Sequence, residues 1–195
     1  MLTGKYLVNL DSEDEGEIFI GCAGGIDTVA RMDYELEAAP EGYSFVRLEI
    51  GDLLGGHSGD DIDKGRANSN KLLARFLYNA IDTFQVVLAD FNGGNLRNAI
   101  PREAFATVYV PADKVEAAQN VFAQVAAEIK AEYAGTDPDA EFIFKPYECA
   151  EGECCTGGDE CKYVPEADAL RFVRAIIACP DGVERMSSEM PGLVE

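Results

Sequence analysis

The sequence is short of basic residues. Lysine and arginine number 16 against 36 aspartates and glutamates, which gives a formal net charge of -20. Negative charge of this size repels the phosphates of nucleic acids and the anionic headgroups of membranes, and no basic stripe provides a local exception. We therefore expect no nucleic acid and no membrane among the partners of this chain.

Long apolar runs are also missing. No stretch approaches the roughly 20 apolar residues that a membrane-spanning helix needs. The opening residues lack the basic start and the long apolar middle of a signal peptide, because Asp11 cuts their apolar run short. Four of the six cysteines crowd one segment, unlike the evenly spaced cysteines of a disulfide framework. These features favour a cytoplasmic location.

Apolar residues nevertheless make up 47% of the chain, enough for a buried core. Periodicity predicts strands at 5–10, 28–36, 43–50, 84–91, 103–110 and 141–147, and helices at 61–82, 112–133 and 165–178. The second strand is expected to pair with the third, and the fourth with the fifth. The expected core includes Met32, Phe45, Phe105, Phe122 and Phe172. This order predicts an α+β fold in which helices cover one face of an antiparallel sheet.

A cysteine-rich segment, 148–162, interrupts the regular pattern before the last helix. It contains Cys149, Cys154, Cys155 and Cys161, but the two adjacent cysteines break the paired CxxC spacing of a zinc ribbon. Acidic neighbours would also disfavour thiolate formation. Two interpretations stay open: a secondary metal or thiol site, and a variable surface loop with incidental cysteines.

Two residues attract attention as candidate site residues near the first strands. Asp11 ends an apolar stretch and begins an acidic cluster, so its carboxylate could reach a divalent cation or simply lie in a solvated loop. His57 is the sole histidine and lies in a glycine-rich turn that leaves its ring accessible. An accessible histidine in a loop is a catalytic candidate or an ordinary surface residue.

A second polar segment, GGNLRNAIPRE, contains Asn98. Its side-chain amide suits a carboxylate or a carbonyl group, although asparagine also forms turns. Arg97 and Arg102 could bind a carboxyl group of a ligand or pair with the many acids of this chain. The polar residues of KGRANSN, which open the expected first helix, are interpreted as helix caps.

Four stretches, taken in order, resemble the aminoacyl-histidine dipeptidases, also called Xaa-His dipeptidases or peptidase D. They are NLDSEDEGEIFIGCAGGID, GGHSGDDIDKGRANSNKLLARFL, LADFNGGNLRNAIPREAFATV and PDGVERMS. These zinc exopeptidases are related to carboxypeptidase G, carnosinase and tripeptidase T. The resemblance is most specific in the first three stretches and weakest from 137 to 164.

The resemblance implies a part of a two-domain enzyme. Full-length members have a catalytic domain with two zinc ions and an inserted lid domain that closes over a dipeptide. By this likeness residues 1–25 are the edge of the catalytic domain and the crossover into the lid. Residues 26–195 are then a ferredoxin-like lid, or dimerisation, domain that is incomplete at its C-terminal end. The core-like residues that directly follow Met1 fit a chain cut from a longer one.

The same resemblance implies roles for single residues. Asp11 matches a zinc ligand, and His57 matches a lid histidine that contacts the substrate carbonyl oxygen in the partner subunit's active site. Asn98 contacts the substrate backbone, with Arg97 as a weaker candidate. The other zinc ligands and the general base have no counterpart here. The isolated chain is therefore expected to be inactive and to hold zinc weakly at most.

Three functions follow from these observations. The first is the lid of a cytoplasmic zinc metallopeptidase that hydrolyses Xaa-His and similar dipeptides and forms a homodimer through the lid. The second is a non-catalytic dimerisation or interaction domain. The third is a metal-binding module formed by the cysteine cluster.

Overall fold

A computed structural model describes residues 3–6, 8, 10, 15–18, 20, 24–147, 161–192 and 194. The chain divides into two units, residues 1–32 and residues 33–195. In the first unit none of the described residues lies in a helix or strand, so the strand predicted at 5–10 has no counterpart among them. The predicted strand at 28–36 is wrong. Its side chains are largely exposed and this part of the chain has no strand partner, which alternation alone cannot supply.

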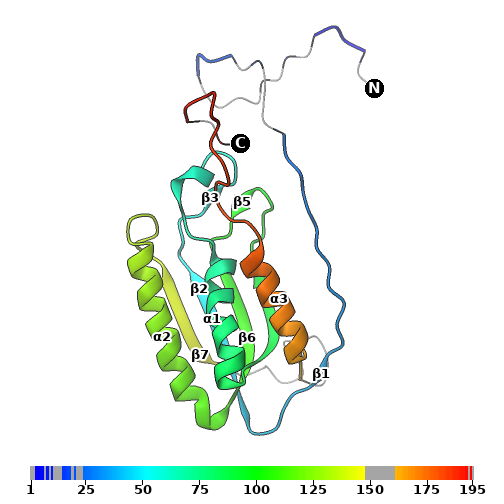
Figure 1. The fold of residues 1–195 in the computed structure, drawn as a ribbon, viewed down its shortest axis with the longest axis vertical. Coiled ribbons are helices and arrows are strands. Elements are labelled where there is room, and N and C mark those ends of the chain that lie inside the picture. The colour runs from blue at the N-terminus through cyan, green and yellow to red at the C-terminus, as the bar shows by residue number, and fades with distance from the viewer. Residues whose placement is uncertain are drawn as a thin grey trace. The chain divides into compact units, whose positions relative to one another are not determined.

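An antiparallel sheet forms the centre of the second unit (Figure 1). Its strands are β2 (Tyr43–Gly51), β4 (Val87–Gly93), β6 (Ala104–Pro111) and β7 (Glu141–Pro146), in the order β4-β6-β2-β7. The sequence alternation in β2 matches the burial of its side chains. Val46, Leu48 and Ile50 are buried, while the residues between them are only half-buried. The predicted hairpin is confirmed by the pairing of β4 with β6, whereas β2 pairs with β6 and β7 instead of 28–36.

Three helices cover one face of this sheet (Figure 1). They are α1 (Ser69–Phe84), α2 (Val115–Glu132), which follows the short turn η2 (Ala112–Lys114), and α3 (Glu166–Ala178). The core lies between the helices and the sheet, where Leu73, Leu77 and Val173 are fully buried. The order β2-α1-β4-β6-α2-β7 is that of a ferredoxin-like fold, so the predicted α+β class is confirmed. None of the helices in the described part is long and apolar enough to cross a bilayer.

The first helix begins later than predicted. Residues Ile62–Lys64 form a short 3-10 turn, η1, which ends at Gly65 in the left-handed conformation with a φ of 64°. Asn68 then caps α1, because its side-chain oxygen accepts the N–H groups of Asn70 at 3.1 Å and Lys71 at 3.4 Å. The capping role expected for this segment is thus confirmed at Asn68, and the residues before it belong to a loop.

Two pairs of very short strands lie outside the main sheet. Strand β3 (Gly56–His57) pairs with β5 (Ala99–Ile100), and β1 (Glu37–Ala38) pairs with β8 (Lys162–Tyr163). A single bridge, Leu88 to Val164, joins this second pair to β4. Two-residue strands are too short to show periodicity, so these four strands could not be predicted from the sequence.

The face of the sheet opposite the helices carries aromatic and charged side chains. Phe45 stacks on Tyr109 with ring centroids 4.7 Å apart, and the Arg47 guanidinium lies 4.1 Å from the centre of the Phe105 ring. Phe45 and Phe105 were expected in the core but are only half-buried here, because strand alternation points them away from the helices. Phe122 is buried as expected.

Candidate functional site

Residues 54–67, which we name the His57 loop, are closed at their base by one carboxylate. Asp137 is buried, with 2% of its surface exposed. Its two carboxylate oxygens accept the N–H of Leu54 at 2.8 Å and the N–H of Ala67 at 2.9 Å. One side chain from the turn before β7 therefore fixes both ends of the loop.

A second carboxylate organises the interior of the His57 loop. Asp61 accepts the backbone N–H of His57 at 2.8 Å, while its own N–H donates to the carbonyl of His57 at 2.9 Å. Lys64 bonds the same carboxylate, and Arg66 lies 3.3 Å from it while also donating to the Gly55 carbonyl. The bond from Lys64, followed by that from the His57 N–H and by the charge of Arg66, lowers the pKa of Asp61.

Two glycines at the start of the loop are needed for this arrangement. Gly55 and Gly56 have φ values of 62° and 136°, a region that other residues rarely adopt. A Cβ atom at Gly55 would collide with the side chain of Arg102, and one at Gly56 would collide with Asp61 and Arg66. The glycine-rich turn seen in the sequence is thus a close-packed turn around charged side chains.

The imidazole of His57 faces the loop through one nitrogen. Its Nδ1 atom accepts the N–H of Gly59 at 3.1 Å and the N–H of Asp60 at 3.3 Å. The Asp60 carboxylate lies 3.6 Å from the same nitrogen. The other ring nitrogen, Nε2, takes no part in these bonds, and about half of the side chain, 51%, is exposed.

The pairing of β3 with β5 brings the second candidate segment beside the first. His57 is the register partner of Ala99, and the N–H of Ser58 donates to the carbonyl of Asn98 at 2.9 Å. Asn98 and Arg97 are both exposed. Two of the residues singled out in the sequence, His57 and Asn98, are therefore neighbours, although 41 positions separate them.

Arginines near the site have structural contacts. Arg102 donates from Nε to the carbonyl of Leu53 at 3.0 Å, which ties the end of β5 to the start of the His57 loop. Arg66, expected among the residues that cap α1, instead bonds Gly55 and Asp61. Sequence reasoning missed Asp61 and Asp137, because nothing in a sequence marks which carboxylate will meet a distant backbone N–H.

Several candidate ligands fall outside the described residues. Asp11, Cys149, Cys154 and Cys155 are among them, whereas Cys161 is described and half-buried beside β8. Within the described ranges, no group of three or more histidine, cysteine, aspartate or glutamate side chains could hold a metal ion. The residues placed here do not fit a zinc site.

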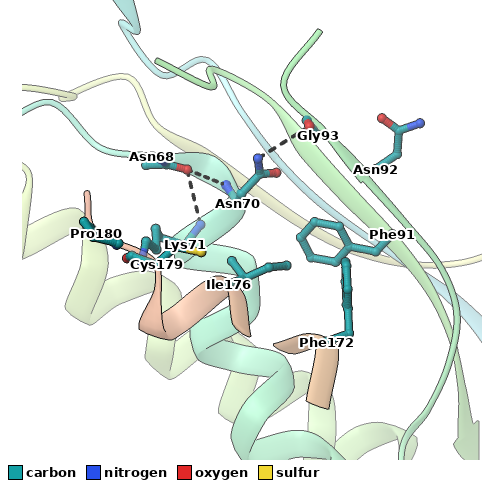
Figure 2. Close-up of a pocket in the computed structure, with 10 residues that line it drawn as sticks. All are labelled: Asn68, Asn70, Lys71, Phe91, Asn92, Gly93, Phe172, Ile176, Cys179 and Pro180. Atoms are coloured by element: carbon teal, nitrogen blue, oxygen red, sulfur yellow. Dashed lines mark hydrogen bonds between the residues drawn. The ribbon is translucent and has the colours of Figure 1, made fainter. Parts of the chain in front are cut away.

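A pocket of about 430 Å³ lies where the start of α1, the end of β4 and the end of α3 meet (Figure 2). Phe91 and Phe172 form one side, with ring centroids 5.3 Å apart. On the other side, Lys71 donates to the carbonyl of Ile177 at 2.9 Å and to that of Cys179. A lysine at the last carbonyls of a helix offsets their partial negative charge, so this cluster joins α3 to α1.

Comparison with known proteins finds a family match for the part of the chain that contains the His57 loop. Residues 49–137 match the model of the M20_dimer family, described as a peptidase dimerisation domain. The matched range begins in β2, includes the His57 loop and the β5 segment, and ends at Asp137. Residues 49–137 therefore resemble a peptidase dimerisation domain. Within this matched range, both exposed candidates, His57 and Asn98, lie on one pair of short strands or directly beside it.

Two relatives extend the similarity beyond the dimerisation domain. The whole chain is 39% identical over 194 residues to the cytosol non-specific dipeptidase of Escherichia coli strain K12, and covers 38% of that protein. The crystal structure of aminoacylhistidine dipeptidase from Vibrio alginolyticus matches 84% of this chain with a TM-score of 0.76 and 37% identity. That match covers 31% of the Vibrio chain. The resemblance predicted from the four motifs is confirmed, and the chain spans about a third of the length of these relatives.

Proposed function

We propose that this chain is the lid and dimerisation part of a cytoplasmic metal-dependent dipeptidase that hydrolyses Xaa-His and similar dipeptides. The observation that carries the proposal is the juxtaposition of exposed His57 and Asn98 in a chain that is 39% identical, along its whole length, to a dipeptidase. The backbone bond from Ser58 to Asn98 brings a histidine and an asparagine close together in the fold, and both side chains can hydrogen-bond a peptide group.

In this proposal each exposed side chain binds one part of the dipeptide. His57 donates a hydrogen bond to the carbonyl oxygen of the scissile peptide, where negative charge grows in the transition state. Asn98 bonds the peptide backbone, and Arg97 attracts the terminal carboxylate. The two zinc ions and the general base that the resemblance implies are assigned to the catalytic domain, with Asp11 as the one residue of this chain assigned to them.

The first unit supports the assignment of 1–25 to the edge of a larger domain. Its described apolar side chains are almost fully exposed, among them Tyr6 at 92%, Ile18 at 91% and Ile20 at 101%. Large apolar side chains that are exposed in such numbers along one segment are usually covered by another surface. In the proposal that surface is the catalytic domain.

The proposed homodimer would form at the β7 edge of the sheet. On the opposite edge, β4 is bridged by Val164, whereas β7 pairs only with β2 in the described part of the chain. Open strand edges favour pairing with another strand, and α2 lies next to β7 (Figure 1). Sedimentation over a range of concentrations tests this point, and a monomer at every concentration would speak against it.

A chimera tests the proposed activity. The aligned segment of the E. coli dipeptidase is replaced by this chain, and hydrolysis of Xaa-His dipeptides is measured alongside the parent enzyme. We expect an active chimera that loses about 10²-fold or more in kcat with His57→Ala, the cost of removing one donor to a developing oxyanion. A folded, dimeric chimera without hydrolytic activity would contradict the proposal.

A further inference from the structure

The hydrogen bonds around His57 determine which ring nitrogen carries the proton. Nδ1 accepts two backbone N–H groups, from Gly59 at 3.1 Å and from Asp60 at 3.3 Å. A nitrogen that accepts an N–H must present a lone pair, so Nδ1 is unprotonated in this arrangement. The neutral imidazole then keeps its proton on Nε2, the nitrogen that takes no part in these bonds.

Gly59 leaves the space that the ring needs. A Cβ atom at this position would lie 3.2 Å from both Cε1 and Nδ1 of His57, closer than most side-chain contacts. The turn that carries these amides is itself held, because Asp61 bonds the backbone N–H of His57. The ring is therefore positioned by its own loop before any ligand arrives.

We propose that Gly59 and Asp60 are positioning residues that hold His57 as an Nε2–H donor aimed away from the loop. This inference rests on the proposed function for its substrate, the carbonyl oxygen of a dipeptide. A donor already fixed in its tautomer and orientation needs little rearrangement when charge grows on that oxygen. The Asp60 carboxylate, 3.6 Å from Nδ1, could accept a hydrogen bond from this nitrogen only if Nδ1 carried the proton, so it is the group that would favour the other tautomer.

Nitrogen NMR of the full 195-residue chain tests the tautomer directly, because His57 is the sole histidine. With ¹⁵N-labelled protein at alkaline pH, we expect the Nδ1 resonance of an unprotonated nitrogen and the Nε2 resonance of a protonated one. We also expect a scalar coupling across the hydrogen bond from the Gly59 amide to Nδ1. A protonated Nδ1, or the absence of that coupling, would overturn the inference.

A matched pair of variants connects the tautomer to hydrolysis. Gly59→Ala crowds the ring, whereas Gly135→Ala adds the same atom to an exposed turn with nothing within 4 Å. In the chimera we expect Gly59→Ala to lower kcat about tenfold or more with little change in KM, since the lost contact strengthens in the transition state. Gly135→Ala should leave both constants and the coupling unchanged.

The two measurements separate the inference from the proposed function. If Gly59→Ala abolishes the coupling but leaves kcat of the chimera unchanged, the substrate contact is wrong while the positioning of the ring stands. If the coupling is missing in the unmodified chain, the positioning is wrong whatever the chimera does. If Gly59→Ala loses the coupling and lowers kcat, while Gly135→Ala changes neither, the result supports the positioning of the ring and its contact with the substrate.

Discussion

The helix-covered face of the sheet and the His57 loop are stabilised by different interactions. Between the helices and the sheet, stability comes from apolar burial, as at Leu73, which has no exposed surface. In the loop it comes from hydrogen bonds to two carboxylates, Asp61 and Asp137. The stabilisation from apolar burial does not depend on a protonation state, whereas hydrogen bonds to carboxylates depend on the ionisation of the carboxylate. The site and the fold can therefore be perturbed separately.

The largest change in the free energy of unfolding is expected from a substitution in the core. Leu73→Ala removes a fully buried side chain from α1 and leaves a cavity against the sheet, which costs about 2–5 kcal/mol in the free energy of unfolding. Urea unfolding monitored by circular dichroism measures the change. The control is Leu96→Ala, at a side chain that is 61% exposed and expected to change the free energy by less than about 0.5 kcal/mol. Equal effects at the two positions would refute the core described here.

The next largest cost in stability is expected at Asp137, which closes the base of the His57 loop. Asp137→Asn retains one acceptor oxygen but replaces the other with a donor that faces a backbone N–H, which costs about 1–3 kcal/mol. Hydrogen exchange of the amides in 54–67 should accelerate more than that of the α2 amides. Asp139→Asn, at an exposed position two residues away, is the control. Uniform acceleration across the sheet and loop would show that Asp137 supports the whole fold and not this loop.

Periodicity was a good guide where the structure depends on burial. The strands at 43–50 and 103–110 and the helices at 112–133 and 165–178 match β2, β6, α2 and α3 to within a few residues. These elements have one face against the core, and that condition produces the alternating or 3.6-residue pattern. The pattern misled at 28–36 because alternation does not reveal whether a neighbouring strand exists.

The site could be predicted only in part, for the same physical reason. His57 and Asn98 were found through the motifs around them, but their contact depends on β3 and β5, which are too short to carry a pattern. The predicted start of the first helix at 61 was wrong because Gly65 adopts a positive φ and Asn68 caps the helix. Asp137 bonds residues 70 and 83 positions away, a pairing that local sequence cannot specify.

The pH dependence of the loop sharpens the comparison further. The pKa of Asp61 is lowered in the folded chain. The stabilisation of the His57 loop by the Asp61 carboxylate is therefore fully present above the ordinary aspartate pKa of about 4, and it is lost as the pH falls through the lowered pKa of the folded chain. We expect the amide resonance of His57, whose N–H bonds Asp61, to shift below about pH 4 while core resonances of α1 do not. In Asp61→Asn this shift should vanish. A shift of equal size in that variant would mean that another group causes it.

The smallest change in the free energy of unfolding is expected on the face of the sheet opposite the helices, where the charged side chains are close to solvent. Burial disfavours the charged form of Glu49, but hydrogen bonds from Lys145 at 2.9 Å and Arg47 at 2.5 Å outweigh it, and its pKa is lowered. Because these side chains are 23–48% exposed, Glu49→Gln should cost less than about 1 kcal/mol, and high salt should reduce the difference. Urea unfolding of both proteins at low and high salt measures it. A cost equal to that of Asp137→Asn, and unaffected by salt, would show that charge on this face is as shielded from water as the carboxylate that closes the His57 loop.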